Sequence, residues 1–342
     1  MKNRKNTFLT YFLLLVSLVY TCVIVINFFM PNSDINIWLS SRLFIAQFLA
    51  FPFMFGGLML VFTAISLGIV KFRKSETILK NIISTIFIIT SVIFMFTGVN
   101  SPKAEKHENG NTIKIVEWNA LNNLTKDSAK KIFKDFDADI AVFPELNPDA
   151  SEISMIYNAF NESSIDFNQY DIFAGFGYGD SIAPVTIISK KDKLRLEQEE
   201  IKYGVRFGTV KAKNKYIEII GLHTAPPIPG LMTEWSLDLE IIDEMVKENP
   251  NAIVIGDFNA NLKHGNMSKL TNHVDVLSST SILKRGTWPQ KLPKVLRASI
   301  DHILLPKDKY SVKNVEIVDL EGSDHAAIFA EIGMKNNRIK MK

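Results

Sequence analysis

The sequence predicts an α+β fold, a four-layer α/β/β/α sandwich of two packed mixed sheets with outer helices, preceded by three transmembrane helices. Two observations lead to this prediction. Residues 1–99 contain three long apolar runs, and beyond residue 111 the predicted strands outnumber the helices, which fall between groups of strands. We therefore divide the chain into a three-span region at 1–99, a linker at 100–111, a globular domain at 112–333 and a basic tail at 334–342.

The three apolar runs are long enough to cross a bilayer. At about 1.5 Å per residue, about 20 residues cross a hydrocarbon core of about 30 Å, and the runs are Phe8–Met30, Leu43–Val70 and Ile78–Val99. Lys80 is the only charged residue within them. A cleavable signal peptide is the alternative for the first run, but no small-x-small cleavage pattern follows it.

The distribution of charge predicts the orientation of these spans. Residues 1–99 hold eight Lys or Arg and two acids, and the bases gather before the first span and between the second and third. The loop 31–42 has only Arg42 and Asp34. The positive-inside bias therefore predicts a multi-pass cell-membrane protein with a cytoplasmic N-terminus and an extracytoplasmic domain. Cys22 is the only cysteine, which excludes intrachain disulfides and a thiolate metal site.

Buried β-branched runs and amphipathic runs define the elements of the domain. Strands are expected at 113–120, 138–146, 184–191, 206–212, 217–223, 252–255, 298–306, 314–320 and 326–332. Helices are expected at 125–136, 148–160 and 232–249. The central run 252–255 ends at Gly256, where the backbone can turn freely, and therefore delivers Asp257 and Asn259 to the rim of a sheet.

Polar residues stand at or just past the ends of five of these strands. They are Asn119, Glu145, His223, Asp257 with Asn259, and Asp301 with Ser323-Asp324-His325. Singly, each has an ordinary explanation, such as a capping Asn, a solvated Glu or a core His with one hydrogen bond. In Gly-Asp-x-Asn at 256–259 the carboxylate can take a proton or hold a metal, and the amide can donate to a charged oxygen. For this motif alone, an Asx-type turn after a strand is an equal alternative.

In this order, the five clusters resemble those of the endonuclease/exonuclease/phosphatase superfamily, which includes deoxyribonuclease-like nucleases, inositol-phosphate phosphatases and bacterial sphingomyelinases. The resemblance covers about residues 112–333, and Gly-Asp-x-Asn together with Ser-Asp-His is specific. The three-span N-terminus and His-Thr-x-Pro-Pro at 223–227 resemble the membrane-anchored bacterial branch, including glycopeptide-resistance-associated membrane proteins. Pro144 departs from the pattern, because many relatives carry Gln there, and this puts a supporting hydrogen bond to Glu145 in doubt.

The resemblance implies an enzyme, a Mg²⁺-dependent phosphodiesterase or phosphatase. Glu145 would be the principal ligand of the cation, with Asn119 in or beside its shell and Asp324 supporting the metal side. Oxygen donors without cysteine suit a hard cation, Mg²⁺ or alternatively Mn²⁺.

The same resemblance assigns the reacting groups. Asp257 would orient or deprotonate the attacking water, and Asn259 would hold a phosphate oxygen. His325, oriented by Asp301, and His223 would contact the phosphoryl group. Which of the carboxylate and the histidines carries the proton stays open.

Three features favour a lipid or lipid-linked phosphate or pyrophosphate, or a phospholipid, over a nucleic acid as substrate. The domain is slightly acidic, whereas a nuclease groove is basic. The linker is short, and the loop 226–235 is unusually apolar. The basic segment Lys284–Arg297 is either a solvated loop or a clamp on an anionic headgroup, with Trp288 at the lipid boundary. An extracytoplasmic nuclease and a non-catalytic phosphate-binding membrane module remain as alternatives.

Three further histidines are interpreted as structural or surface residues. His302 follows Asp301 on a predicted strand, and alternation points it to the other face, where a structural role is expected. His264 and His273 have no partner pattern, so we expect them at the surface.

Overall fold

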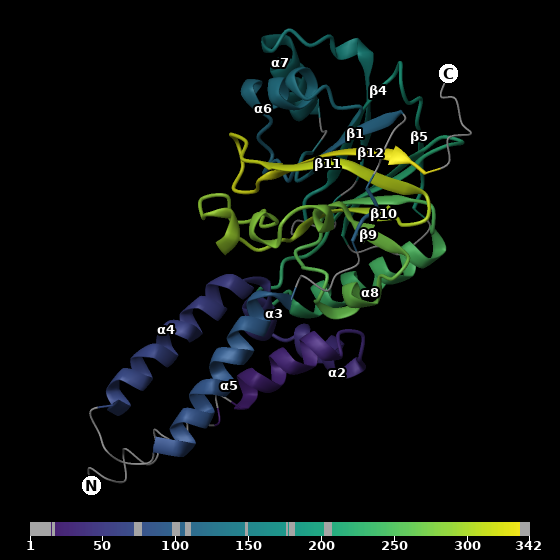
Figure 1. Cartoon of the computed structure of the whole chain (residues 1–342). Coiled ribbons are helices and arrows are strands. Elements are labelled where there is room, and N and C mark those ends of the chain that lie inside the picture. Colours follow the sequence, from purple (N-terminus) through teal and green to yellow (C-terminus); the bar gives the residue numbers. More distant parts are fainter. Residues whose placement is uncertain are drawn as a thin grey trace. The chain divides into compact units, whose positions relative to one another are not determined.

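The computed structural model describes residues 15, 18–71, 77–97, 103–106, 111–147, 150–175, 177, 182–201 and 207–335. The chain forms two compact units, Met1–Asn100 and Ser101–Lys342 (Figure 1). Most of the predicted basic tail and the first part of the predicted span Phe8–Met30 lie outside the described residues.

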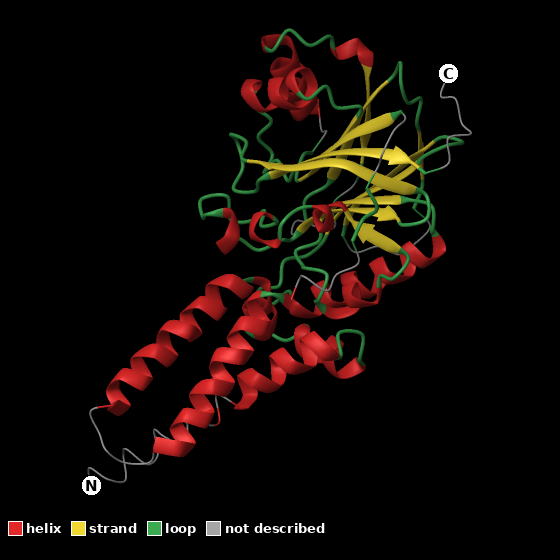
Figure 2. Cartoon of the chain, viewed as in Figure 1, coloured by secondary structure: helices red, strands yellow, loops and turns green. Residues whose placement is uncertain are grey.

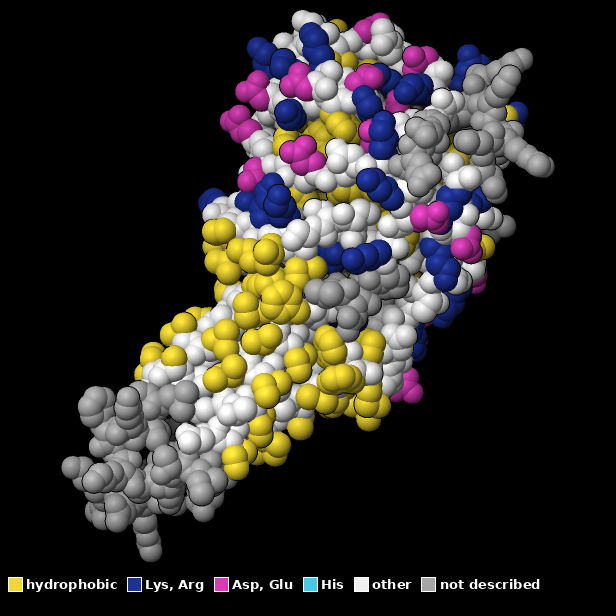
Figure 3. Space-filling model, viewed as in Figure 1, with side chains coloured by type: hydrophobic (Ala, Val, Ile, Leu, Met, Phe, Trp, Pro, Cys, Tyr) yellow, Lys and Arg dark blue, Asp and Glu magenta, His cyan; other side chains and the backbone are white. Residues whose placement is uncertain are grey.

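The first unit is helical. Residues 18–29 are helical, and the helices that follow are α2 (Asp34–Ser40), α3 (Ile45–Ala50), α4 (Pro52–Lys71) and α5 (Thr77–Met95). The predicted run Leu43–Val70 is therefore two helices, because Pro52 has no N–H to continue α3 but fits the first turn of α4. Rings of Tyr20, Phe48 and Phe94 form an aromatic cluster, with Phe48 stacked on Phe94 at 4.5 Å between centroids. Many other apolar side chains of this unit are exposed (Figure 3).

No helix within the described residues combines the length and the apolar character that crossing a bilayer requires. The predicted loop 31–42 contains helix α2, which begins after the Ser33 cap.

The second unit contains two six-stranded sheets that pack face to face (Figure 2). The first has the order β11-β12-β1-β2-β4-β3, and the second has the order β5-β6-β7-β8-β10-β9. Both are mixed, because β1 runs parallel to β2 and β7 parallel to β8, while the other pairs are antiparallel. The strands are β1 (Thr112–Glu117), β2 (Ile140–Pro144), β3 (Tyr170–Ala174), β4 (Val185–Lys190), β5 (Glu197–Glu199), β6 (Gly208–Lys213), β7 (Glu218–His223), β8 (Ile253–Asp257), β9 (His273–Asp275), β10 (Asp301–Pro306), β11 (Tyr310–Val318) and β12 (Ala327–Met334).

Helices cover the outer faces of both sheets, which confirms the predicted α/β/β/α sandwich. On the first sheet lie α6 (Lys126–Lys130), a π-helical turn at Lys131–Asp135 and α7 (Ala150–Glu162), and on the second lies α8 (Met232–Glu248) (Figure 1). Short 3-10 turns also occur, at Phe167–Gln169, Gly265–Lys269, Val276–Ser279, Ile282–Lys284 and Lys294–Leu296.

Two hydrophobic layers hold this unit together. Between the sheets, inward-facing residues of alternating strand positions pack, including Ile115, Val142, Ile219 and Ile255. Under α6 and α7, a second layer is rich in aromatic residues, among them Phe133, Phe143 and Phe160. Burying each such side chain stabilises the fold by about 1.5–3 kcal/mol relative to exposing it.

The sequence pattern does not predict three of the strands, namely β3, β5 and β9. Each lies at the edge of its sheet and has only three to five residues. An edge strand pairs on one side only and needs no continuous apolar run, so the pattern that marks the central strands is missing.

Part of the predicted linker belongs to the second unit. Lys106 forms a parallel bridge with Val312, whose N–H donates to the Glu105 carbonyl at 2.7 Å. The Ala104 N–H donates to Ser278 Oγ at 2.8 Å. Residues 103–106 therefore lie against the edge strand β11.

The surface positions expected for His264 and His273 are wrong, because both side chains are buried. His273 Nε2 lies 2.8 Å from the Ala252 carbonyl, and His264 Nδ1 accepts the Asn261 N–H at 3.0 Å. Their partners are backbone groups, which leave no pattern in the sequence.

Candidate active site

The register of the second sheet positions the centre of the site. Asp257 ends β8, where it stands beside His223 of β7 and opposite Asp301 of β10. The close approach of β8 to β7 requires a glycine at position 256, directly before Asp257. Gly256 has φ of +149°, and a β-carbon there would lie 1.9 Å from the Leu222 carbonyl oxygen. The predicted cluster on this sheet is thus one contiguous row.

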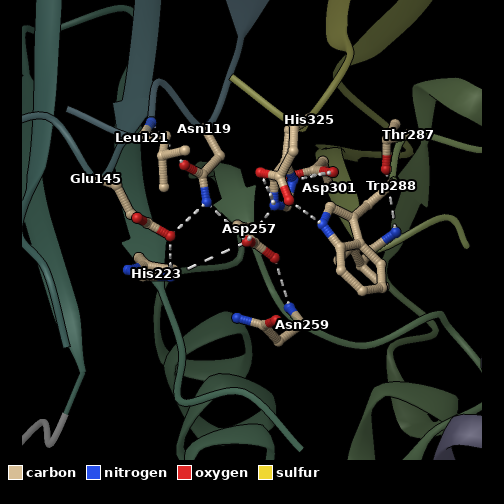
Figure 4. Close-up of polar contacts among 12 residues, drawn as sticks. Asn119, Leu121, Glu145, His223, Asp257, Asn259, Thr287, Trp288, Asp301 and His325 are labelled. Carbon is tan, nitrogen blue, oxygen red and sulfur yellow. Dashed lines mark hydrogen bonds and ion pairs between the residues drawn. The ribbon is translucent and has the colours of Figure 1, made fainter. Parts of the chain in front are cut away.

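The first sheet supplies Asn119 and Glu145 to the same place (Figure 4). Asn119 follows β1, and Glu145 follows β2, where its N–H donates to the Pro184 carbonyl at 3.0 Å. The Asn119 amide nitrogen donates to Glu145 Oε1 at 2.8 Å and to Asp257 Oδ2 at 3.0 Å. His223 Nε2 lies 3.4 Å from Glu145 Oε1. One amide therefore links carboxylates from the two sheets.

His325 is held by groups on three elements. Its Nδ1 lies 3.0 Å from both oxygens of the fully buried Asp301 carboxylate. The Trp118 indole donates to the His325 carbonyl at 3.0 Å, and the His325 N–H donates to Ser323 Oγ at 3.0 Å. These contacts turn Nε2 toward Asp257, with Oδ2 3.8 Å away.

Burial and neighbouring charges shift the pKa values of Asp257 and His325 away from their ordinary values. Burial, reinforced by the Asp301 charge, raises the pKa of Asp257 to about 6, and His325 and His223 oppose this rise. Burial lowers the pKa of His325, but the charge of Asp301 and its hydrogen bond outweigh burial and raise the pKa to about 10. Near neutral pH the site therefore offers an imidazolium next to a carboxylate able to accept a proton.

Backbone strain is concentrated here. Leu121, Asn122, Glu145 and Asn259 have φ of +46°, +52°, +55° and +48°. The left-handed region costs an ordinary residue about 1–2 kcal/mol, so the surrounding hydrogen bonds must hold these residues in place. The Asn259 N–H donates to Asp257 Oδ1 at 2.8 Å, and its side-chain nitrogen donates to the Thr224 carbonyl at 3.0 Å. The second hydrogen of that amide is available for a phosphate oxygen.

The residues at this centre fit a hard divalent cation. Ligand atoms of Glu145, His223 and Asp257 lie within 4.8 Å of one another, and so do those of Asp257, Asp301 and His325. The second set already uses Nδ1 of His325 to bind Asp301, so the first set is the better candidate. Its two carboxylates converge from opposite sheets, and a divalent cation would offset their repulsion. Asn119 lies between them, with its nitrogen rather than its oxygen toward the carboxylates.

Asp324 lies on the other side of the centre. Its Oδ2 accepts the Trp288 indole N–H at 2.8 Å, and its Oδ1 lies 4.0 Å from His325 Nε2. It belongs to neither candidate ligand set, and its support of the metal side stays a prediction. The indole draws this carboxylate toward His325.

The segment 284–297 borders the site, and two of its cations, Lys294 and Arg297, bind groups of their own domain. The Trp288 ring lies 6.3 Å from that of His325, at an angle of 42°. Arg297 forms an ion pair with Asp319 at 2.6 Å, and Lys294 Nζ donates to the Ile317 carbonyl at 2.5 Å. These contacts hold the loop itself together.

Sequence reasoning missed Glu117, which lies on β1 two residues before Asn119. It is fully buried, and neither carboxylate oxygen has a hydrogen-bond partner among the described residues. Burial, then the charges of Asp301 and Asp257, raise the pKa of Glu117 well above its ordinary value. The available signal was an acid directly after the apolar pair Ile115-Val116 on a predicted strand.

His302 has the structural position that alternation predicts. It is buried, with Nδ1 2.7 Å from Asp275 Oδ2 and Nε2 2.9 Å from the Ala260 carbonyl. Both partners only accept hydrogen bonds, so both ring nitrogens donate.

Comparison with known proteins places this site in a family. Residues 116–325 match the Endonuclease/Exonuclease/phosphatase family, and the chain belongs to it. The resemblance to this superfamily inferred from the sequence is therefore confirmed.

Two solved structures with a TM-score of 0.50 share the fold. D. rerio TDP2 complexed with a single-strand DNA product is 19% identical, and the match covers 66% of this chain and 100% of that one, with a TM-score of 0.50. A humanized D. rerio TDP2 is 18% identical over 65% of this chain and 99% of that one, with a TM-score of 0.50. The Bacteroides thetaiotaomicron mannosyl-6-phosphatase is 16% identical over 65% and 99%, with a TM-score of 0.45. No curated protein matches the chain.

The raised pKa of Asp257 predicts pH-dependent cation binding. At pH 5, about one unit below the Asp257 pKa of about 6, a proton competes with the cation for this carboxylate. We expect the apparent Mn²⁺ affinity to be about tenfold lower at pH 5 than at pH 7.5 by titration calorimetry. Asp257→Asn should bind more weakly and lose this difference. Equal affinity of the wild-type protein at both pH values would contradict the assignment.

The pairing of Asp301 with His325 predicts a second measurable shift. Asp301→Asn removes the charge that offsets burial, so the pKa of His325 should fall from about 10 by at least one unit. Imidazole C–H resonances followed by NMR across the titration would report it, with His273 as an internal reference. An unchanged His325 pKa would show that another group stabilises the imidazolium.

Proposed function

We propose that this protein hydrolyses phosphoric esters with the help of a bound Mg²⁺ or Mn²⁺. The observation that carries the proposal is the convergence of two sheets on one point. There the Asn119 amide joins the Glu145 and Asp257 carboxylates, and His325, held by Asp301, faces Asp257. Family membership supports the same reaction class.

Each residue has a part that its contacts support. The Asp257 carboxylate orients the attacking water. The His325 imidazolium, fixed by Asp301, offsets negative charge that develops on the phosphoryl oxygens. Asn259 donates its remaining amide hydrogen to a phosphate oxygen. When bound at Glu145 and Asp257, the cation would offset further charge on the reacting phosphoryl group.

His223 and Trp288 complete the proposed substrate contacts. His223 lies between Glu145 and Asp257, at 3.4 Å and 4.0 Å, and can add a donor to the phosphoryl group. Trp288 presents an indole beside His325, and its N–H is already used by Asp324. We therefore assign Trp288 a contact through its ring face rather than through a hydrogen bond.

We further propose that the chain is anchored in the cell membrane with its second unit outside, and that it acts on a lipid-linked phosphate or pyrophosphate or a phospholipid. Three apolar runs and the placement of basic residues support the anchor. Exposed apolar side chains on α4 and α5 support it too, namely Leu58, Val61, Ile65, Ile86 and Ile89.

Two alternatives predict different behaviour. A nuclease needs cations that face a nucleic-acid backbone, but Arg297 and Lys294 bind groups of their own domain. A non-catalytic phosphate-binding module would not need the aligned Asp257, Asp301 and His325. Hydrolysis of a phosphoric ester other than a nucleic acid is therefore the function that these contacts favour.

Removing site groups should abolish hydrolysis. Glu145→Gln, Asp257→Asn and His325→Gln should each lower the metal-dependent release of phosphate or headgroup at least about 100-fold. A chelator should stop the reaction and Mg²⁺ should restore it. Asp308→Asn, at an exposed turn, is the matched control and should leave the rate unchanged.

The substrate panel for this experiment contains phospholipids, polyprenyl phosphates, sugar phosphates, nucleotides and plasmid DNA. Rapid nicking of DNA without turnover of any lipid would favour the nuclease. No turnover of any compound would favour the binding module.

The orientation can be tested through the single native cysteine. In a Cys22→Ser background, Asp308→Cys should react with a membrane-impermeant maleimide in intact bacterial cells. Lys74→Cys, in the predicted cytoplasmic loop, should react only after permeabilisation. The reverse pattern, or release of the protein from membranes by alkaline carbonate, would refute the proposed topology.

A further inference from the structure

One residue at the rim of the site has a backbone conformation that its side chain does not favour. Leu121, two residues after Asn119, has φ of +46°, a region that Gly and Asn adopt far more readily than Leu. Its side chain is 50% exposed and belongs to neither hydrophobic layer of the domain. Core packing therefore does not account for a leucine here.

Contacts with the site fix this conformation. The Leu121 N–H donates to Asn119 Oδ1 at 3.1 Å, and the Asn122 N–H donates to the Glu145 carbonyl at 2.6 Å. The Asn147 N–H donates to Asn122 Oδ1 at 3.2 Å, which ties the turn to the Glu145 loop a second time. The isobutyl group of Leu121 lies beside Asn119 and Glu145 (Figure 4).

A second exposed apolar side chain lies past the same end of the sandwich. Ile228, 48% exposed, is five residues after His223 in the loop that follows β7, and His223 itself lies 3.4 Å from Glu145. Five large apolar side chains of the described part of this unit are exposed, and two of them follow strand ends that supply site residues. The others are Tyr157, Leu237 and Leu283.

A leucine can recognise only hydrocarbon, because it has no hydrogen-bonding group. Water and a small polar ester would gain nothing from it. A phosphate ester of a hydrophobic alcohol carries its hydrocarbon next to the phosphoryl group, so an exposed leucine at the rim of the centre is suited to contact that hydrocarbon. Such a contact would explain the positive φ of Leu121, because the strained turn holds an apolar side chain at the edge of a polar site.

We propose that Leu121, supported by Ile228, binds the hydrocarbon part of the substrate and selects phosphate esters of long-chain alcohols over small polar esters. This inference rests on the proposed hydrolase function and assigns its specificity to a named side chain. The shared chemistry is an alkyl chain attached through a phosphate oxygen, whether it comes from an isoprenoid or from a diacylglycerol.

The test compares Leu121→Asn with Leu121→Met in the full chain. Asn accepts positive φ and should fold with an unchanged or higher Tm, yet it lacks the apolar surface. Met keeps that surface. With Mg²⁺ and substrates below their micelle concentration, Leu121→Asn should lower kcat/KM at least about tenfold on farnesyl phosphate or dioctanoyl phosphatidic acid. It should stay within about twofold of wild type on glycerol phosphate, and Leu121→Met should resemble wild type on all three.

The two lipid substrates separate the possible sources of the chain, since preference for one identifies an isoprenoid or a diacylglycerol. Equal losses on the lipid and on glycerol phosphate would overturn the inference, as would no loss on either. Failure of the proposed function is distinguishable, because it would leave the wild-type protein without turnover of any ester. In that case, binding of dodecyl phosphonate and methyl phosphonate by wild type and Leu121→Asn decides the question. A weaker affinity of the variant for the dodecyl compound alone supports the inference, and equal affinities overturn it.

Discussion

The contact on which the site depends is the hydrogen-bonded bridge from the Asn119 amide to Glu145 and Asp257. Each carboxylate comes from a different sheet, so the bridge also joins the two halves of the sandwich at their rim. Two like charges in a poorly solvated place repel each other, and an amide dipole offsets only part of that repulsion. Burial and the charge of Asp301 also raise the pKa of Asp257 to about 6. A site with uncompensated negative charge is suited to attract a cation.

The architecture around the bridge leaves little freedom. Gly256 lets β7 and β8 approach closely, and their register fixes His223, Asp257 and Asp301 in one row. Strained residues concentrate at the same rim, where hydrogen bonds from neighbouring loops hold them. Such preorganisation keeps polar groups aimed at a reacting centre before substrate arrives, which is the main way in which enzymes stabilise developing charge.

The central strands and the site residues that follow them could be predicted from the sequence, because buried β-branched runs and the polar residues at their ends are local patterns. The edge strands β3, β5 and β9 could not, since strands paired on one side need no apolar run. The position of Asp324 depends on a partner 36 residues away in the sequence, and the burial of His273 depends on a backbone carbonyl. The buried position of Glu117 has a local signature, because this acid directly follows two apolar residues on a strand. The positive φ of Leu121 has no signature in its own residue type.

The short pairing of residues 103–106 with β11 has a consequence for how the molecule behaves at high local concentration. An outermost strand with free N–H and C=O groups invites another chain to add to the sheet. In this protein, residues 103–106 cover part of the β11 edge, where Lys106 pairs with Val312. A bulge between Val312 and Asn314 further interrupts β11. The segment that leads into the domain thus leaves less of the β11 edge free to pair with another chain.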